Sequence, residues 1–134
     1  MTMVLEFKVN EEVKPEQMAE VFKLSGIKRP YEDLERMKKM IDQADIIISC
    51  WEGDRIVGLA RAITDYSYCC YLSDLAVIKD FQRKNIGKDL VQHLQKVLGD
   101  GVSIVLLSSE QALSFYPQIG FELVNNGFRM SRKF

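Results

Sequence analysis

Apolar residues recur with two different periods along this chain, and each period predicts a different kind of element. Short runs of branched and aromatic residues, bounded by turn residues, are typical of strands. Such runs lie at 4–9, 46–51, 56–64, 69–78 and 102–107. Elsewhere apolar residues recur every three or four positions, which is typical of one face of a helix. Helices are predicted at 15–24, from Pro30 onward, from Ile86 onward and at 110–118.

Turn residues indicate how the strands connect. Turns at 52–55 and 65–67 join the three strands between 46 and 78 into an antiparallel meander. The helix from Ile86 then returns the chain to 102–107, parallel to the strand before it. Asn125-Asn126-Gly127 predicts a closing hairpin of 121–124 with 128–131. We therefore expect an α/β (α+β) fold with a mixed, mostly antiparallel sheet of about six to seven strands.

The overall composition restricts the class of protein. With 134 residues, 47% of them hydrophobic and 28% charged, we expect a single domain spanning 1–134. The 18 basic and 19 acidic residues nearly cancel, which argues against a general nucleic-acid surface. No run approaches the roughly 20 apolar residues of a membrane span, and the N-terminus lacks a secretion-signal pattern. We expect a cytoplasmic protein with neither a nucleic-acid nor a membrane partner.

The cysteines do not form a pattern that would bind a metal. Cys50, Cys69 and Cys70 all lie in or beside apolar strand-like runs, so they are interpreted as core residues with free thiols. No second cysteine pair and no histidine cluster completes a metal site. We therefore expect no metal.

The stretch 71–88 carries the clearest chemical signal in the chain. An apolar strand leads into a polar loop with Lys79, Arg83 and Lys84, and the loop opens the helix that begins at Ile86. The first N–H groups of a helix lack internal partners, and its dipole makes that end positive. With Lys88 beside it, this corner is a predicted seat for a phosphate group. The glycine spacing excludes a P-loop and a dinucleotide fingerprint.

The loop resembles the Gln/Arg-x-x-Gly-x-Gly/Ala signature of the GCN5-related N-acetyltransferases, the GNAT family, which cradles the pyrophosphate of coenzyme A. Gln82 matches the first position and Gly87 matches the second glycine. Asn85 stands at the first glycine position. Asn tolerates a positive φ, so the turn is expected to form with this residue.

A second stretch, 112–121, strengthens the resemblance. It looks like the family motif Ala-x-x-Phe-Tyr-x-x-x-Gly-Phe, with Ala112, Phe115, Tyr116, Gly120 and Phe121 at every defined position. The two motifs occur in the family's order, separated by the expected helix and strand. The resemblance implies the GNAT fold, with helices on both faces of the sheet and two central strands that splay apart to form an acyl-CoA cleft.

The resemblance also implies which residues bind acetyl-CoA as co-substrate. The backbone of Leu75, Ala76 and Val77 would hold the pantetheine arm, and the N–H of Val77 would stabilise the oxyanion. The full set of implied cofactor-binding residues is Leu75, Ala76, Val77, Gln82, Arg83, Lys84, Asn85, Ile86, Gly87, Lys88, Ser109, Ala112 and Phe115.

Two side chains are the implied or inferred catalytic residues. Tyr116 stands at the position of the family's common general acid, which protonates the leaving thiolate. Asp74 lies in a nearly apolar strand, where an ionised carboxylate is costly without a partner. It is interpreted as a base or a substrate contact, with a structural ion pair to an arginine such as Arg61 as the alternative. Lys28 and Arg29 are interpreted as part of a solvated loop, with contact to an anionic substrate group as the alternative.

These observations lead to one main functional hypothesis. The chain is expected to transfer the acetyl group of acetyl-CoA to a primary amine of a small molecule or peptide, by direct attack in a ternary complex. By resemblance, a homodimer that meets through the C-terminal strands is expected. A non-catalytic acyl-CoA-binding or sensing module of the same fold is the alternative. A larger donor such as succinyl-CoA is a third hypothesis, which Lys28, Arg29 or Arg61 near the thioester would favour.

Overall fold

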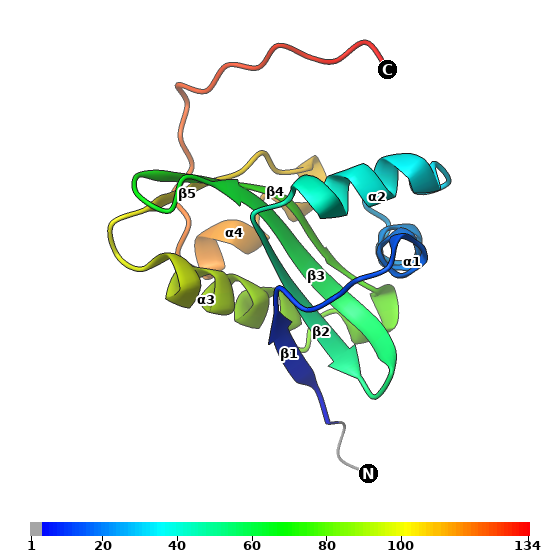
Figure 1. Ribbon diagram of the computed structural model, residues 1–134. Coiled ribbons are helices and arrows are strands. Elements are labelled where there is room, and N and C mark those ends of the chain that lie inside the picture. The colour runs from blue at the N-terminus through cyan, green and yellow to red at the C-terminus, as the bar shows by residue number, and fades with distance from the viewer. Residues whose placement is uncertain (1–3) are drawn as a thin grey trace.

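The computed structural model describes residues 4–134, and it shows one central sheet with helices on both faces (Figure 1). Residues 1–3 lie outside the described residues. They begin the N-terminal stretch for which no secretion signal is predicted. The elements follow in the order β1 (Glu6–Val9), α1 (Pro15–Ser25), α2 (Leu34–Gln43), β2 (Ile46–Glu52), β3 (Arg55–Thr64), β4 (Cys69–Val77), α3 (Ile86–Leu98), β5 (Ser103–Val105) and α4 (Phe115–Gln118), with 3₁₀ turns at Lys79–Phe81 and Glu110–Ala112.

The sheet has the strand order β1-β2-β3-β4-β5. The first four strands pair antiparallel in sequence, and β5 pairs parallel with β4 after the crossover through α3. The predicted mixed, mostly antiparallel sheet with helices on both faces is therefore confirmed. It has five strands in the described residues, slightly fewer than the six to seven expected.

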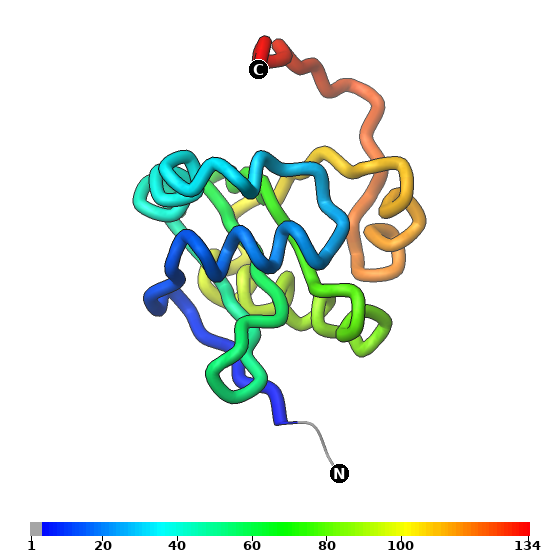
Figure 2. Tube along the Cα trace, turned by 90° about the vertical axis from the view of Figure 1, so that its right-hand side faces the viewer, coloured from blue at the N-terminus to red at the C-terminus, as the bar shows by residue number. Residues whose placement is uncertain are grey.

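The core fills the two spaces between the sheet and its helices. α1 and α2 lie side by side on one face, while α3 covers the other (Figure 2). β2 and β3 are buried along almost their whole length, because helices cover both of their faces. On α3 the apolar side chains at helical spacing are buried as the sequence predicts, namely Ile86, Leu90, Val91, Leu94 and Leu98.

Two predicted helices have different bounds in the structure. α2 begins at Leu34, not at Pro30, because the Asp33 carboxylate accepts a hydrogen bond from the N–H of Arg36 and caps the helix there. The predicted helix 110–118 is divided into a 3₁₀ turn and the short α4. Pro117 has no N–H to donate to a carbonyl four residues back, so the two pieces do not merge into one helix.

The predicted closing hairpin of 121–124 with 128–131 is wrong. These residues form no strand, and the chain from 122 onward is exposed and leaves the body as an extended segment (Figure 1). Leu123, Phe128 and Met130 have almost no contact with the rest of the chain, with 81%, 101% and 99% of their surface exposed. A lone two-stranded hairpin is marginal unless its apolar face is covered, and no element within residues 4–134 covers it.

One cysteine also differs from the interpretation as a core residue. Cys50 and Cys70 are buried, but Cys69 is exposed at the start of β4. Side chains alternate between the two faces of a strand, so neighbouring cysteines at 69 and 70 necessarily point to opposite sides.

The contact between β4 and β5 is short, and it positions the site. Only Cys69, Cys70 and Tyr71 of β4 pair with β5, so the rest of β4 has no strand on that side. At this point β4 also carries a bulge, since Arg61 pairs with Asp74 while its neighbour Ala62 pairs with Leu72. β4 therefore separates from β5 near Ser73, as expected for two central strands that splay.

Candidate active site

The loop between β4 and α3 has the backbone that a cradle for an anion needs. Arg83 and Asn85 both adopt the left-handed conformation, each with φ 65°. Asn85 is the N-cap of α3, and its carbonyl accepts the first helical hydrogen bond from the N–H of Asp89 at 2.9 Å. Asn at the family's first glycine position therefore takes the conformation that favours glycine, and the turn forms with it, as expected.

Donors and positive charges gather at this loop. In residues 4–134, the backbone N–H groups of 83–88 make no hydrogen bond to another protein group. Arg83, Lys84 and Lys88 are exposed around them. Free amides at the positive end of a 13-residue helix, together with three cations, fit a pyrophosphate group.

The Gln82 side chain makes its hydrogen bonds to backbone carbonyl groups of the protein. Its amide donates to the carbonyl of Val77 at 2.8 Å and to that of Ser25 at 3.3 Å. The loop is thereby tied to the end of β4 and to the end of α1. Gln82 is thus placed to hold the loop in position.

The two sequence motifs meet in space. Gly87 at the start of α3 lies against the ring of Phe115, and a Cβ at Gly87 would come within 3.1 Å of the Phe115 Cζ. The Tyr116 ring lies edge-on to Phe115 at 5.2 Å and to Phe121 at 5.5 Å. The missing side chain of Gly87 therefore allows the second motif to pack directly beside the loop between β4 and α3.

Tyr116 is partly buried in this cluster. Burial raises the pKa of its phenol above the usual value, and the positive charge of Arg29 opposes part of that rise. The phenol is therefore protonated at neutral pH and has a proton to donate, as a general acid requires.

The other implied binding residues lie around the separation of β4 from β5. Leu75, Ala76 and Val77 form the end of β4, beyond its pairing with β5. Ser109 immediately precedes the 3₁₀ turn that contains Ala112. Their contacts with acetyl-CoA, including the oxyanion donor at Val77, stay predictions.

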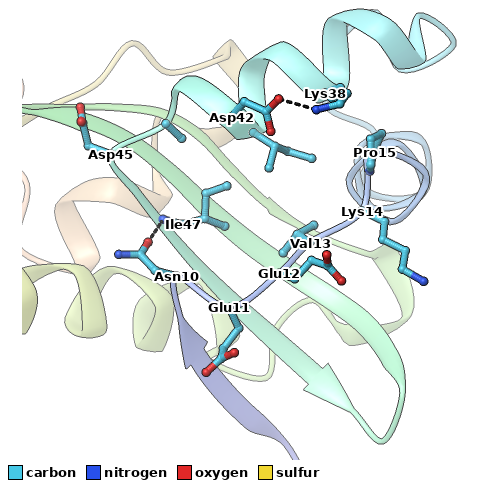
Figure 3. A pocket seen from close by; sticks show the side chains of 12 residues that line it. Asn10, Glu11, Glu12, Val13, Lys14, Pro15, Lys38, Asp42, Asp45 and Ile47 are labelled. Carbon is cyan, nitrogen blue, oxygen red and sulfur yellow. Dashed lines mark hydrogen bonds and ion pairs between the residues drawn. The ribbon is translucent and has the colours of Figure 1, made fainter.

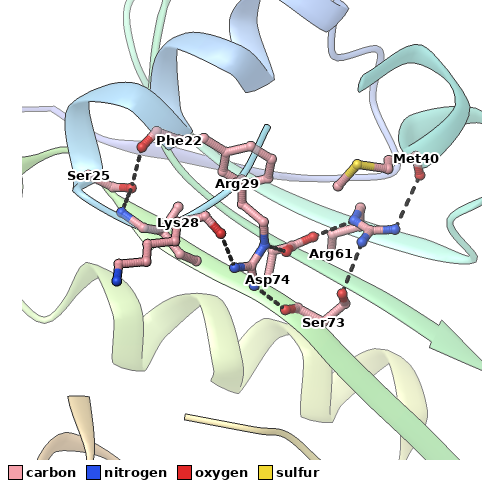
Figure 4. A network of polar contacts seen from close by, with 9 residues as sticks. Phe22, Ser25, Lys28, Arg29, Met40, Arg61, Ser73 and Asp74 are labelled. Carbon is pink, nitrogen blue, oxygen red and sulfur yellow. Dashed lines mark hydrogen bonds and ion pairs between the residues drawn. The ribbon is translucent and has the colours of Figure 1, made fainter. Parts of the chain in front are cut away.

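Asp74 lies at the centre of a buried polar network (Figure 4). Its Oδ1 accepts a hydrogen bond from Nε of Arg29, and its Oδ2 accepts one from Nε of Arg61. The alternative interpretation, a structural ion pair with Arg61, is therefore present in the structure. A catalytic or substrate-binding role for Asp74 stays a prediction.

Sequence reasoning missed the position of Arg29. It was interpreted as part of a solvated loop, but it folds inward onto β4 and also donates to the carbonyl of Ser73 at 2.9 Å (Figure 4). The partners Arg29 and Asp74 are 45 positions apart, so no local pattern could have revealed the pair. The one signal in the sequence was the carboxylate of Asp74 in an otherwise nearly apolar strand, which indicates that Asp74 needs a partner.

A pocket lies away from these residues. It has a volume of about 460 Å³, and its lining includes Asn10, Glu11, Lys38 and Asp42 (Figure 3). None of the predicted site residues lines it. Across residues 4–134, no group of three or more His, Cys, Asp or Glu is placed to hold a metal. No helix in that range is long and apolar enough to span a membrane.

Comparison with known proteins identifies related sequences. A family model described as "Acetyltransferase (GNAT) domain" matches residues 9–131. An uncharacterised N-acetyltransferase, ycf52 of Porphyra purpurea, is 32% identical over 101 residues, which cover 71% of this chain and 56% of that protein. Two curated acetyltransferases of Glycine max are matched over 35% and 32% of their length. The chain thus spans only about a third to a half of these relatives.

Solved structures share the fold over nearly the whole chain. A GNAT family acetyltransferase from Streptococcus pneumoniae superposes with a TM-score of 0.79 at 23% identity, covering 97% of this chain and all of that one. An aminoglycoside N-acetyltransferase in complex with CoA has a TM-score of 0.73 at 14% identity, covering 100% and 98%. At these identities the structures show the fold. Together with the family match, they do not favour a non-catalytic binding module.

Proposed function

Because the chain belongs to the GNAT acetyltransferase family and is thus an acyltransferase, we propose that it transfers the acetyl group of acetyl-CoA to a primary amine of a small molecule or peptide. One observation carries this proposal. The phosphate-binding loop and the tyrosine motif, 28 residues apart from Gly87 to Phe115, pack against each other beside the free end of β4. In this proposal, the packing brings the thioester of acetyl-CoA close to Tyr116, the proton donor.

Each part of the site has a proposed role in binding acetyl-CoA, which supplies the acetyl group as a thioester. The amides of 83–88, with Arg83, Lys84 and Lys88, bind the pyrophosphate. Leu75, Ala76 and Val77 bind the pantetheine arm along β4, and Ser109, Ala112 and Phe115 line the opposite side. These assignments are supported by the free amides, the local charge and the separation of β4 from β5.

The chemistry assigns separate tasks to the residues. The transfer forms an amide C–N bond and breaks the thioester C–S bond, so the amine loses a proton and the sulfur gains one. Tyr116 donates the proton to sulfur, and the N–H of Val77 stabilises the negative charge that develops on oxygen. Both oxygens of the buried Asp74 carboxylate already accept a hydrogen bond from an arginine, so we propose that Asp74 contributes mainly by positioning Arg29.

We also propose that two copies of the chain form a homodimer through the C-terminal segment. This segment exposes apolar side chains, including Leu123, Phe128 and Met130, and in residues 4–134 the outer edge of β5 has no strand beside it. An unpaired strand edge favours pairing with another chain.

The test combines binding and turnover. Acetyl-CoA at 100 times its Kd should stabilise the fold by about 2.7 kcal/mol and raise the Tm by roughly 5–10 °C, whereas ATP should not. Screening amines for acetyl-CoA-dependent thiol release should then identify an acceptor. Tyr116→Phe should lower kcat about 10²-fold or more and keep the Tm shift.

Tyr68→Phe is the matched control, because Tyr68 is exposed on the turn before β4 and its ring lies outside the motif cluster. This control should keep full activity. A Tyr116→Phe enzyme with wild-type kcat would refute the acid role of Tyr116. A wild-type protein without a CoA-specific shift would refute the proposed function itself.

A further inference from the structure

The network around Asp74 contains more positive than negative charge. Two guanidinium groups, Arg29 and Arg61, share the one carboxylate of Asp74. Within residues 4–134, no other carboxylate lies within 4 Å of either arginine. A partly buried guanidinium without its own counterion attracts anions more strongly than a solvated one, because water screens it less.

The two arginines differ in what they can reach. The Arg61 side chain is 9% exposed, and it also donates to the hydroxyl of Ser73 at 2.9 Å and to the carbonyl of Met40 at 3.5 Å. The Arg29 side chain is 27% exposed. Arg61 therefore belongs to the interior, and Arg29 is the member of the network that faces outward.

Arg29 is held rigidly yet keeps free donors. Its Nε donates to Asp74, one N–H of Nη1 donates to the carbonyl of Lys28 at 2.7 Å, and one N–H of Nη2 donates to the carbonyl of Ser73 (Figure 4). A guanidinium has five N–H donors, so two remain, one on each terminal nitrogen. One free N–H on each terminal nitrogen gives two donors, and a carboxylate has two oxygens that can accept from them.

The position of Arg29 relates these donors to the reaction. Ser73 and Asp74, which hold the guanidinium, are the residues at which β4 leaves β5, directly before 75–77. The positive charge of Arg29 also acts to lower the pKa of the Tyr116 phenol. The free donors therefore lie near the end of the site where acyl group and amine would meet.

We propose that Arg29, positioned by Asp74, binds a carboxylate carried by one of the two substrates of the transfer. This inference rests on the proposed function and deepens it. The carboxylate belongs either to the acceptor, as in an amino acid, or to a dicarboxylic acyl group on the donor, as in succinyl-CoA. In either case Arg29 binds the same chemical group, a carboxylate. The experiment below distinguishes a carboxylate on the acceptor from one on the donor.

The experiment compares substrates that differ only in a carboxylate. In one arm acetyl-CoA is the donor, and lysine is compared with its decarboxylated twin cadaverine, and β-alanine with ethylamine. In the other arm succinyl-CoA is compared with acetyl-CoA on an uncharged acceptor. In one arm the wild type should prefer the carboxylate substrate in kcat/KM by about tenfold or more, the effect of one charge-assisted hydrogen bond.

Variants then connect the preference to Arg29. Arg29→Lys keeps a positive charge beside Asp74 but loses the planar fork, and Arg29→Gln removes the charge while Asp74 keeps its ion pair with Arg61. Each should reduce the preference to about threefold or less, with the CoA-dependent Tm shift retained as evidence of folding. Lys28→Gln, a neighbouring exposed cation that makes no ion pair in the described residues, should keep the preference.

A merely structural role for Arg29 would lower the rates on both members of a substrate pair equally, so the ratio is the decisive readout. Equal kcat/KM for both members in both arms would overturn this inference and leave the acetyltransferase intact. A preference that persists in both Arg29 variants would also overturn it. The absence of thiol release from every pair would remove the proposed function together with this inference.

Discussion

Asn85 shows how one residue decides whether a motif still works after a substitution. At φ 65° a residue with a β-carbon is strained by about 1–2 kcal/mol, whereas glycine is not, and asparagine tolerates the conformation better than most. Asn85 therefore differs from the family signature in its side chain, but it keeps the left-handed backbone conformation that glycine favours.

The strain at Asn85 can be measured by substitution. Asn85→Gly should leave the free energy of unfolding within about 0.5 kcal/mol, while Asn85→Ala should lower it by about 1 kcal/mol and weaken acetyl-CoA binding. Urea unfolding and calorimetric titration would give the two values. Lys84→Ala is the control for the free energy of unfolding alone, because Lys84 is not among the residues with positive φ. Identical stabilities for the glycine and alanine variants would contradict the strain.

The Tyr116 phenol predicts a particular alkaline limit of activity. Because burial raises its pKa, its protonated form, and the stability this form contributes, persists below pH 10 and is lost as pH rises through the raised value. The kcat of the wild type should therefore fall only above pH 10, measured with an acceptor amine that is already neutral there. The residual activity of Tyr116→Phe should show no such fall. A decline of wild-type kcat at pH 8 would exclude Tyr116 as its source.

At the residue scale, the sequence predicted the conformation of Asn85 and offered Arg61 as a partner of Asp74, but it did not predict the second partner, Arg29. The first depends on the residue's own backbone preference. The second depends on Arg29, which reaches Asp74 only once the loop between α1 and α2 has folded over β4.

At the scale of elements, the decisive contact is between α3 and the segment that holds α4. Gly87 lies in the first turn of α3, and its lack of a side chain is what brings Phe115 so close. The sequence motifs predicted both pieces, and the structure adds that they form one unit.

A double-mutant cycle tests this contact. Gly87→Ala should displace the Phe115 ring and weaken acetyl-CoA binding about tenfold, and Phe115→Leu in the same chain should restore part of the loss. The measurements are Kd values for the two single variants and the double variant. Gly101→Ala is the matched control, because a Cβ there meets nothing within 4 Å. Strictly additive effects would mean that the contact does not matter for binding.

The limits of prediction at this scale come from capping and from proline. Apolar periodicity located α1, α2 and α3, but the start of α2 depends on the Asp33 cap, and the break before α4 depends on Pro117. Both are local chemical effects that override a periodic pattern, and both displace a boundary without changing the order of the elements.

At the scale of the whole molecule, the C-terminal segment is the one large departure from expectation. The Asn125-Asn126-Gly127 turn and its apolar flanks predict strands, yet the part of the chain that the structure describes provides no surface to cover them. A second copy would provide one, which links the failed hairpin to the proposed dimer.

Light scattering after size exclusion should therefore give twice the 15.4 kDa of one chain. Phe128→Asp with Met130→Asp should shift the protein to a monomer, because charges on a strand face that must be buried oppose its pairing. Tyr68→Asp, at another highly exposed aromatic residue, should leave the mass unchanged. A wild-type monomer at 100 micromolar would rule out the proposed interface.

The three register pairs between β4 and β5 have a further consequence, for how the molecule opens. In the described residues, three register pairs join the backbone of 103–121 to the sheet, so we expect this segment to form a unit that unfolds locally at lower free energy than β2 and β3. Hydrogen exchange there should be fast in the free protein and slow once acetyl-CoA bridges α3 and this unit. Part of the binding free energy is then used to order the segment 103–121, which contains Tyr116, so the proton donor becomes fixed only when acetyl-CoA is bound.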